Sequence, residues 1–195
     1  MGATKSEGRF FACREERDAY ARRLKTRACP GCGAVGFLIC HGFLKGYAPS
    51  GDEKVVRGFR FYCSKRRRDG GGCGETYSIL LSDVLPRRST RAPQLWSFFK
   101  TVLRGLSRSV AWRREARRAA PSRPPFSLSH AYRLWARLKA REARIREWVC
   151  REAPLPSSDR RGALFQLLEH LNCVFGNPPC PITAWQEHFQ SPFPL

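Results

Sequence analysis

Four of the nine cysteines fall into two groups, and their spacing constrains the fold more than any other feature of this 195-residue chain. The first group is a CPGCG turn with Cys29 and Cys32, and the second is the pair Cys63 and Cys73. Two thiols from a tight turn and two from a distant segment are typical of a tetrahedral zinc site. We therefore predict a Zn²⁺ ion bound by these four cysteines. Because four thiolates leave no open position, its role should be structural rather than catalytic.

Other cysteine and histidine residues leave alternatives for the ligand set. His41 lies between the two groups and could replace a ligand of the second group, whereas Cys40 beside it would point to the opposite face of a strand, as a buried thiol. We interpret the remaining cysteines as structural, namely Cys13, Cys150, Cys173 and Cys180. The last two could form a second metal site with His170 and His188, although their spacing does not require one.

The segment around the cysteines has the hydrophobic pattern of a small β-structure. Residues 36–47 are rich in β-forming residues, a Pro/Gly turn follows, and apolar residues nearly alternate along residues 54–63. A third strand is predicted at residues 75–81. Two metal-binding turns on such a hairpin form a zinc ribbon, which we assign to residues 29–85. Residues 1–28 should be a tail followed by a short basic helix over residues 9–27.

An insertion between the last two cysteines is strongly basic. Nine residues separate Cys63 from Cys73, and three adjacent arginines stand beside three glycines, namely Arg66, Arg67 and Arg68. One interpretation is a flexible basic finger, residues 64–72, that contacts phosphate groups. The other is an exposed, solvated loop.

Residues 86–151 are predicted to form a basic helical domain. Residues 92–106 have apolar side chains at helical spacing with Pro93 in the first turn, residues 107–120 form a short helix, and residues 127–151 form the longest one. This order is that of a helix-turn-helix unit, whose later helix enters the major groove of DNA. An arginine stripe is also typical of a solvated face. The candidate nucleic-acid contacts are Arg113, Arg114, Arg117, Arg133, Arg137, Arg141 and Arg144.

The C-terminal segment, residues 152–195, differs in character from the basic helices. Residues 150–195 carry three arginines against four acidic residues, a net charge of −1. Helices are predicted at residues 162–176, which have a strong apolar face, and at residues 180–189. We expect this segment to pack on the middle helices, and a homodimer contact through its first helix is the alternative.

The overall charge points to a polyanionic partner. The chain has a formal net charge of +20, and residues 87–146 carry 17 Lys and Arg against Glu115 and Glu142, a net charge of +15. No apolar stretch approaches the length of about 18 residues expected of a membrane-spanning helix, and the first ten residues are polar. We therefore expect a cytoplasmic, nucleoid-associated protein that binds nucleic acid and no membrane.

The motifs CPGCGAVGFLICHGFLKG, RGFRFYC and CGETYSILL together resemble the N-terminal zinc ribbon of bacterial insertion-sequence transposases. The later strings SVAWRREA and LSHAYRLWARLKARE are similar to the helix-turn-helix that often follows it, so the resemblance covers residues 27–150. It implies the same four cysteine ligands. Such transposases also carry an RNase H-like catalytic domain, for which this chain, with five Asp in all, has no room.

These observations predict an α+β protein with a small β zinc ribbon followed by an all-α, helix-turn-helix-like domain. Its predicted function is to bind double-stranded DNA as a transposase-derived or element-associated protein without a catalytic domain. An RNA- or ribosome-associated protein is the alternative, with Trp112, Trp135 and Trp148 available to stack on bases. No paired carboxylates or nucleophile and histidine constellation are apparent, so no enzymatic activity is predicted.

Overall fold

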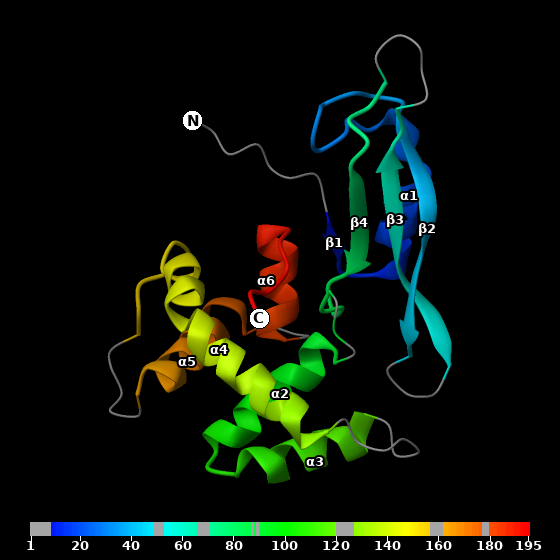
Figure 1. Cartoon of the computed structure of the whole chain (residues 1–195). Helices are drawn as coiled ribbons and strands as arrows, with labels where there is room; N and C mark the ends of the chain where they lie inside the picture. Colours follow the sequence, from blue (N-terminus) through cyan, green and yellow to red (C-terminus); the bar gives the residue numbers. More distant parts are fainter. Residues whose placement is uncertain are drawn as a thin grey trace.

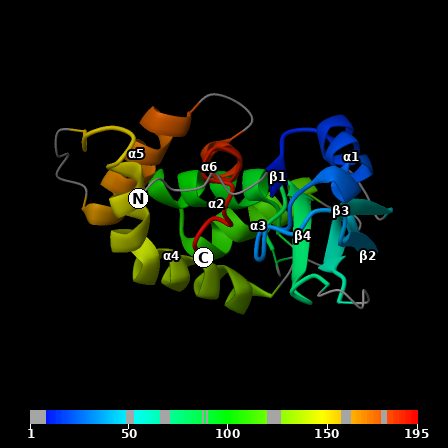
Figure 2. The same cartoon turned by 90° about the horizontal axis from the view of Figure 1, so that it is seen from above.

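A computed structural model describes residues 9–48, 53–65, 71–86, 88, 90–119, 127–156, 162–176 and 180–195. The described residues form one four-stranded sheet and six α-helices, which confirms the predicted α+β class. The sheet lies at one end with α1 (Arg14–Arg22) against it, and the other helices form a separate layer (Figures 1 and 2).

The sheet follows the predicted strands and adds one that the sequence did not predict. β2 (Leu38–Tyr47), β3 (Lys54–Cys63) and β4 (Thr76–Leu81) are antiparallel neighbours, and β1 (Phe10–Phe11) pairs in parallel with β4. The resulting strand order is β1-β4-β3-β2. Residues 9–27 are therefore not one helix, because the backbone around Phe10 and Phe11 hydrogen-bonds to β4 before α1 begins.

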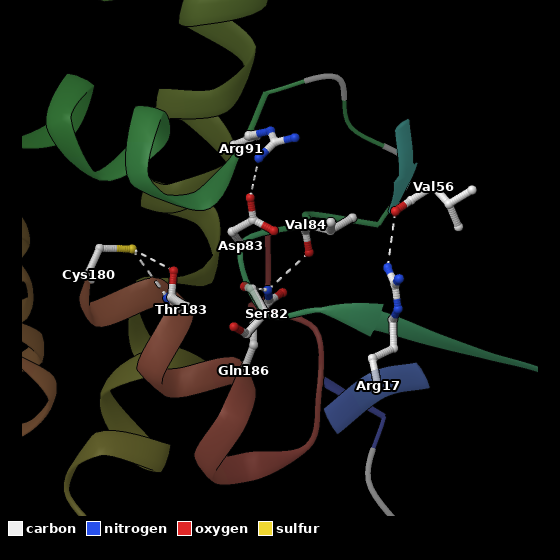
Figure 3. A network of polar contacts seen from close by, with 9 residues as sticks. All are labelled: Arg17, Val56, Ser82, Asp83, Val84, Arg91, Cys180, Thr183 and Gln186. Atoms are coloured by element: carbon white, nitrogen blue, oxygen red, sulfur yellow. Dashed lines mark hydrogen bonds and ion pairs between the residues drawn. The ribbon is translucent and has the colours of Figure 1, made fainter. Parts of the chain in front are cut away.

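Helix α1 covers one face of the sheet and carries a buried arginine. Arg17 is 2 % exposed, and its guanidinium donates to the carbonyl of Val56 at 3.1 Å and lies 4.8 Å from the centre of the Phe59 ring (Figure 3). The apolar cluster beneath this helix is small and includes two of the candidate ligands. Its buried members are Leu24, Cys29, Leu38, Phe61, Cys63 and Ile79.

The helical layer has a larger apolar core. Its elements are α2 (Ala92–Leu103), α3 (Arg108–Ala119), α4 (Leu128–Val149), α5 (Ala163–Phe175) and α6 (Pro181–Phe189), each close to its predicted range. α5 packs on α4, and α6 packs on both α5 and α2. Among the described residues, no helix has the length and apolar composition needed to cross a membrane.

Two glutamines, the buried Gln186 of α6 and the half-buried Gln190 directly after it, join this core to the strand region. The amide nitrogen of Gln186 donates to the carbonyls of Ser82 at 2.5 Å and Val84 at 3.0 Å (Figure 3). Its side-chain oxygen accepts from the backbone N–H of Phe193 at 3.1 Å. Gln190 makes further contacts with the backbone of Phe10 on β1. The sheet and the helices are therefore connected by hydrogen bonds as well as by chain continuity.

Replacing Gln186 with leucine is expected to destabilise the protein by roughly 2–4 kcal/mol, because two carbonyls and one N–H group would be left buried without partners. Urea unfolding followed by circular dichroism measures this change in the free energy of unfolding. The half-buried Gln166 of α5 provides a control, and its replacement with leucine should cost much less. Equal effects of the two substitutions would contradict this role for Gln186.

Candidate metal centre and arginine surface

The structure brings the four predicted cysteine ligands together. Their sulfur atoms all lie within 4.8 Å of one another, with Cys29 Sγ 3.7 Å from Cys73 Sγ and Cys32 Sγ 3.8 Å from Cys63 Sγ. A tetrahedral ion with metal–sulfur bonds of about 2.3 Å has sulfur–sulfur edges of about 3.8 Å. The four thiols therefore fit a single metal ion of this size.

The first turn is shaped by two backbone hydrogen bonds around the CPGCG motif. The N–H of Gly33 donates to the carbonyl of Cys29 at 2.8 Å, and the N–H of Cys29 donates to the carbonyl of Ala34 at 2.9 Å. Gly33 has a φ of 72°, a left-handed conformation that glycine adopts without steric cost. The same turn directs the N–H of Gly31 toward Cys29 Sγ at 3.4 Å.

The second turn repeats these contacts despite the insertion. The N–H of Gly74 donates to the carbonyl of Cys63 at 3.0 Å, and the N–H of Cys63 donates to the carbonyl of Glu75 at 2.9 Å. A hydrogen bond of 2.7 Å from the N–H of Gly72 to the carbonyl of Ser64 closes the base of the insertion. The sulfurs of Cys63 and Cys73 therefore lie within 4.8 Å of each other although nine residues separate these cysteines.

The site contains a hydroxyl group that the sequence did not single out. The hydroxyl of Tyr77, near the start of β4, lies within hydrogen-bond distance of two sulfurs, 3.6 Å from Cys29 Sγ and 3.7 Å from Cys73 Sγ. Burial raises the pKa of the Tyr77 hydroxyl, and its hydrogen bonds to the two sulfurs raise it further. The only sequence signal for this group is the aromatic residue in the string CGETY.

The thiols differ in how readily they ionise. Burial acts to raise the pKa of Cys29, but hydrogen bonds from the Cys32 backbone, Tyr77 and the Gly31 backbone outweigh it and lower this pKa to about 6. Burial raises the pKa of Cys63 to about 12, and its hydrogen bond to Cys29 contributes. A bound cation would overcome the cost of ionising the buried Cys63 thiol, because a coordinating thiol is deprotonated by the metal.

Replacing Gly72 with alanine is expected to weaken metal binding by about 10- to 100-fold, the range typical of changes in the shell around metal ligands. An added Cβ would lie 2.1 Å from Cys63 Sγ, so the ligand would have to move. Gly42 of β2, where an added Cβ meets nothing within 4 Å, provides the control. Competition with a chromophoric zinc chelator measures both affinities, and equal values for the two variants would contradict the geometry of the second turn.

The remaining cysteines and histidines form no further metal cluster among the described residues. His41 does not replace a cysteine ligand, because it lies on β2 with its ring 6.0 Å from that of Tyr62. The expectation of a buried Cys40 is wrong, since this thiol is exposed at a register shift of β2. Cys150 and Cys173 are also exposed, whereas Cys180 is buried at the start of α6, where it accepts from the N–H of Thr183.

The predicted arginines of α3 and α4 lie on the surface. Arg113, Arg114 and Arg117 of α3 and Arg133, Arg137, Arg141 and Arg144 of α4 are all exposed. The acidic groups of α4 are engaged elsewhere, since Glu142 pairs with Arg146 at 2.5 Å and Glu147 pairs with Arg151 at 2.6 Å. Arg66, Arg67 and Arg68 lie outside the described residues.

Several of these charges repel one another. Burial lowers the pKa of His130, and the nearby charges of Arg133, Arg88 and Arg137 lower it further. Burial also lowers the pKa of Arg88, with added repulsion from Arg137 and Arg133. The N-terminal half of α4 is therefore strongly electropositive.

A tight turn joins α2 to α3, and one of the three tryptophans considered for base stacking, Trp112, is packed inside. Residues 104–107 form the turn, with Gly105 at a φ of 93°. Trp112 is fully buried against Phe98, while the partly buried Trp135 and Trp148 pack on aromatic rings of the core. Trp112 therefore cannot stack on a base without unpacking the core.

Comparisons with protein-family profiles, with curated proteins and with solved structures found no match for this chain. The resemblance of residues 27–150 to transposase ribbons therefore depends on the motifs alone. The four-cysteine cluster is the part of the site that both the sequence pattern and the geometry support.

Proposed function

We propose that this chain is a zinc-binding, DNA-binding protein in which a structural Zn²⁺ ion holds the β-sheet and exposed arginines of the helical layer contact the duplex. The observation that carries this proposal is the set of four sulfurs within 4.8 Å of one another, on a chain whose positive charge is concentrated in residues 87–146. Ligand sets made only of thiolates favour Zn²⁺ over harder cations, and structural zinc sites of this kind are closed.

Duplex contact is supported by the exposed arginines and by the helix arrangement. Within the described residues, Arg137, Arg141 and Arg144 have no acidic partner, so they are available to phosphate groups. The helices follow the order expected of a helix-turn-helix-like domain, and the later helix, α4, would enter the major groove. The proposed origin of these residues is a bacterial insertion-sequence transposase or an associated mobile element, and their proposed role is to bind DNA.

The proposal is tested by metal analysis and by binding selection. The purified chain should contain one zinc per molecule, and it should bind duplex DNA with an affinity that falls steeply as salt increases. Selection from random duplexes would then define any preferred site. Preference for structured RNA over duplex DNA in direct competition would favour the RNA-associated alternative, and metal-dependent cleavage of the duplex would contradict a purely binding role.

A further inference from the structure

A cavity of about 870 Å³ lies between the sheet and the last residues of the chain. Along β4, Tyr77 and Ile79 face the cluster beneath α1, whereas Ser78 and Leu80 line the cavity. Successive side chains of a strand point to opposite faces, so the cavity is on the face of the sheet away from α1. It is therefore separate from the cluster beneath α1 that contains Cys29 and Cys63.

The wall of this cavity contains a buried arginine with no partner. Arg57 of β3 is 7 % exposed, and its Nε and Nη2 atoms are buried without a hydrogen-bond partner. These two nitrogens form one edge of the guanidinium plane, the edge that binds two oxygens of an oxyanion at once. Buried charges in native proteins are normally paired, and this edge lacks a hydrogen-bonded counter-charge among the described residues.

The backbone is built to place Arg57 in this position. In the pairing of β2 with β3, Leu44 opposes Gly58 and Lys45 opposes Val56, which leaves Arg57 as an extra residue. Such bulges redirect a side chain from the face that strict alternation would give it. Gly46 on β2 provides the space, because an added Cβ there would lie 2.3 Å from Arg57 Cδ.

The charges around Arg57 suit an anion with more than one negative charge. None of the described side chains that line the cavity is acidic, and Arg88 donates to the C-terminal residue Leu195 at 3.1 Å. Five cationic side chains line the cavity, namely Arg9, Lys45, Arg57, Arg60 and Arg88. Burial lowers the pKa of Arg57 and repulsion from Arg91 adds to this, while Asp83 opposes it. The Oδ2 atom of Asp83 forms an ion pair with Arg91 at 2.5 Å.

We propose that this cavity binds a small phosphorylated ligand of nucleotide size, with its phosphate on the Nε–Nη2 edge of Arg57. A phosphate monoester carries a charge of about −1.5 to −2 at neutral pH, which matches the cluster of cations. The volume falls within the range of about 300–1,000 Å³ typical of small-molecule sites. Phe10 and Phe193 supply apolar wall for the rest of the ligand. This inference does not depend on DNA binding by the helices.

The test is calorimetric titration of the full-length, zinc-loaded chain with adenosine 5′-monophosphate as the probe. We expect saturable binding of one molecule per chain, and binding of adenosine should be weaker by about 10- to 100-fold, because it lacks the group that pairs with a buried charge. Inorganic phosphate should compete but bind more weakly than the nucleotide. Duplex DNA binding, measured separately, distinguishes failure of this inference from failure of the proposed function.

Two charge-conserving variants locate the binding. Arg57→Lys keeps the positive charge but removes the two-nitrogen edge, and Gly46→Ala displaces Arg57 without altering any charged group. Both should weaken nucleotide binding by about tenfold or more. Gly42→Ala, on the same strand with open space around an added Cβ, should bind as the unmodified chain does. Thermal melting of each variant verifies that it is folded.

Specific outcomes would overturn the inference. If both variants leave nucleotide binding unchanged, or if binding never saturates, the nucleotide is attracted only by the general positive charge of the surface. If succinate binds as tightly as adenosine 5′-monophosphate, the site does not select phosphate. If inorganic phosphate binds as tightly as the nucleotide, the site does not contact the organic part of the ligand. Tighter, Arg57-dependent binding of a 5′-phosphorylated oligonucleotide than of the nucleotide would identify the ligand as a strand end.

Discussion

Replacing Cys73 with serine is expected to abolish stoichiometric metal binding and to unfold the sheet. The variant removes one of four sulfurs that lie within 4.8 Å of one another, so the ion would lose a closed tetrahedral shell. Zinc affinity should fall by about a hundredfold or more, since changes outside the ligand shell already cost 10- to 100-fold. Metal analysis after dialysis against a weak chelator, with circular dichroism of the same samples, measures both effects.

The loss of structure should accompany the loss of metal because the apolar cluster under α1 is small. Two of its buried members, Cys29 and Cys63, are themselves ligands. Binding free energy in small zinc sites is largely folding free energy, with apparent values of about 10–16 kcal/mol. Cys40→Ser is the matched control, because Cys40 is an exposed thiol of β2 outside the cluster. A Cys73→Ser chain that retains one zinc and a folded sheet would refute the assignment.

Replacing Arg133, Arg137, Arg141 and Arg144 with glutamine is expected to remove most of the affinity for duplex DNA. These exposed side chains of α4 lie in the basic middle of the chain, and none of the acidic residues of α4 pairs with them. The slope of log affinity against log salt concentration should decrease by about 0.9 for each phosphate contact that is lost. Fluorescence anisotropy with a labelled duplex over a salt series measures this slope.

The control for this variant removes the same charge from the other end of the molecule. Arg14, Arg22, Arg23 and Lys25 lie in or directly after α1, are exposed, and can be replaced with glutamine together. If general attraction to the positively charged chain dominates, both quadruple variants should lose affinity equally. If α4 contacts the duplex, its variant should lose far more affinity and reduce the slope, and the α1 variant should behave almost as the unmodified chain does.

Much of the fold follows from local sequence patterns. The strand at residues 54–63 and the helices after residue 91 were predicted within a few residues, because apolar spacing and proline or glycine positions mark their limits. The ligand set follows from cysteine spacing, which is a covalent feature of the chain. β1 was missed, since a two-residue strand has no periodicity and depends on pairing with β4, nearly seventy residues away.

The side-chain environments that the sequence analysis predicted wrongly or missed are those that depend on tertiary packing. Trp112 looked available for stacking, but it is fully buried against Phe98 of α2, whereas Trp135 and Trp148 remain partly exposed. The orientation of Arg57 depends on a register shift between two strands, which no hydrophobic pattern reveals. Cys40 was expected to be buried because cysteine is commonly a core residue, yet it lies exposed where β2 and β3 shift register.

The hydrogen bond between Gly72 and Ser64 has a consequence for how such sites are recognised. It joins the two ends of the insertion directly beside Cys63 and Cys73, whose sulfurs lie within 4.8 Å of each other although nine residues separate them in the sequence. A search that demands a fixed two-residue spacer would overlook chains of this kind, whereas one that requires glycine on each side of the last cysteine would find them. The same closed base makes this loop a suitable position for a peptide tag or spectroscopic label.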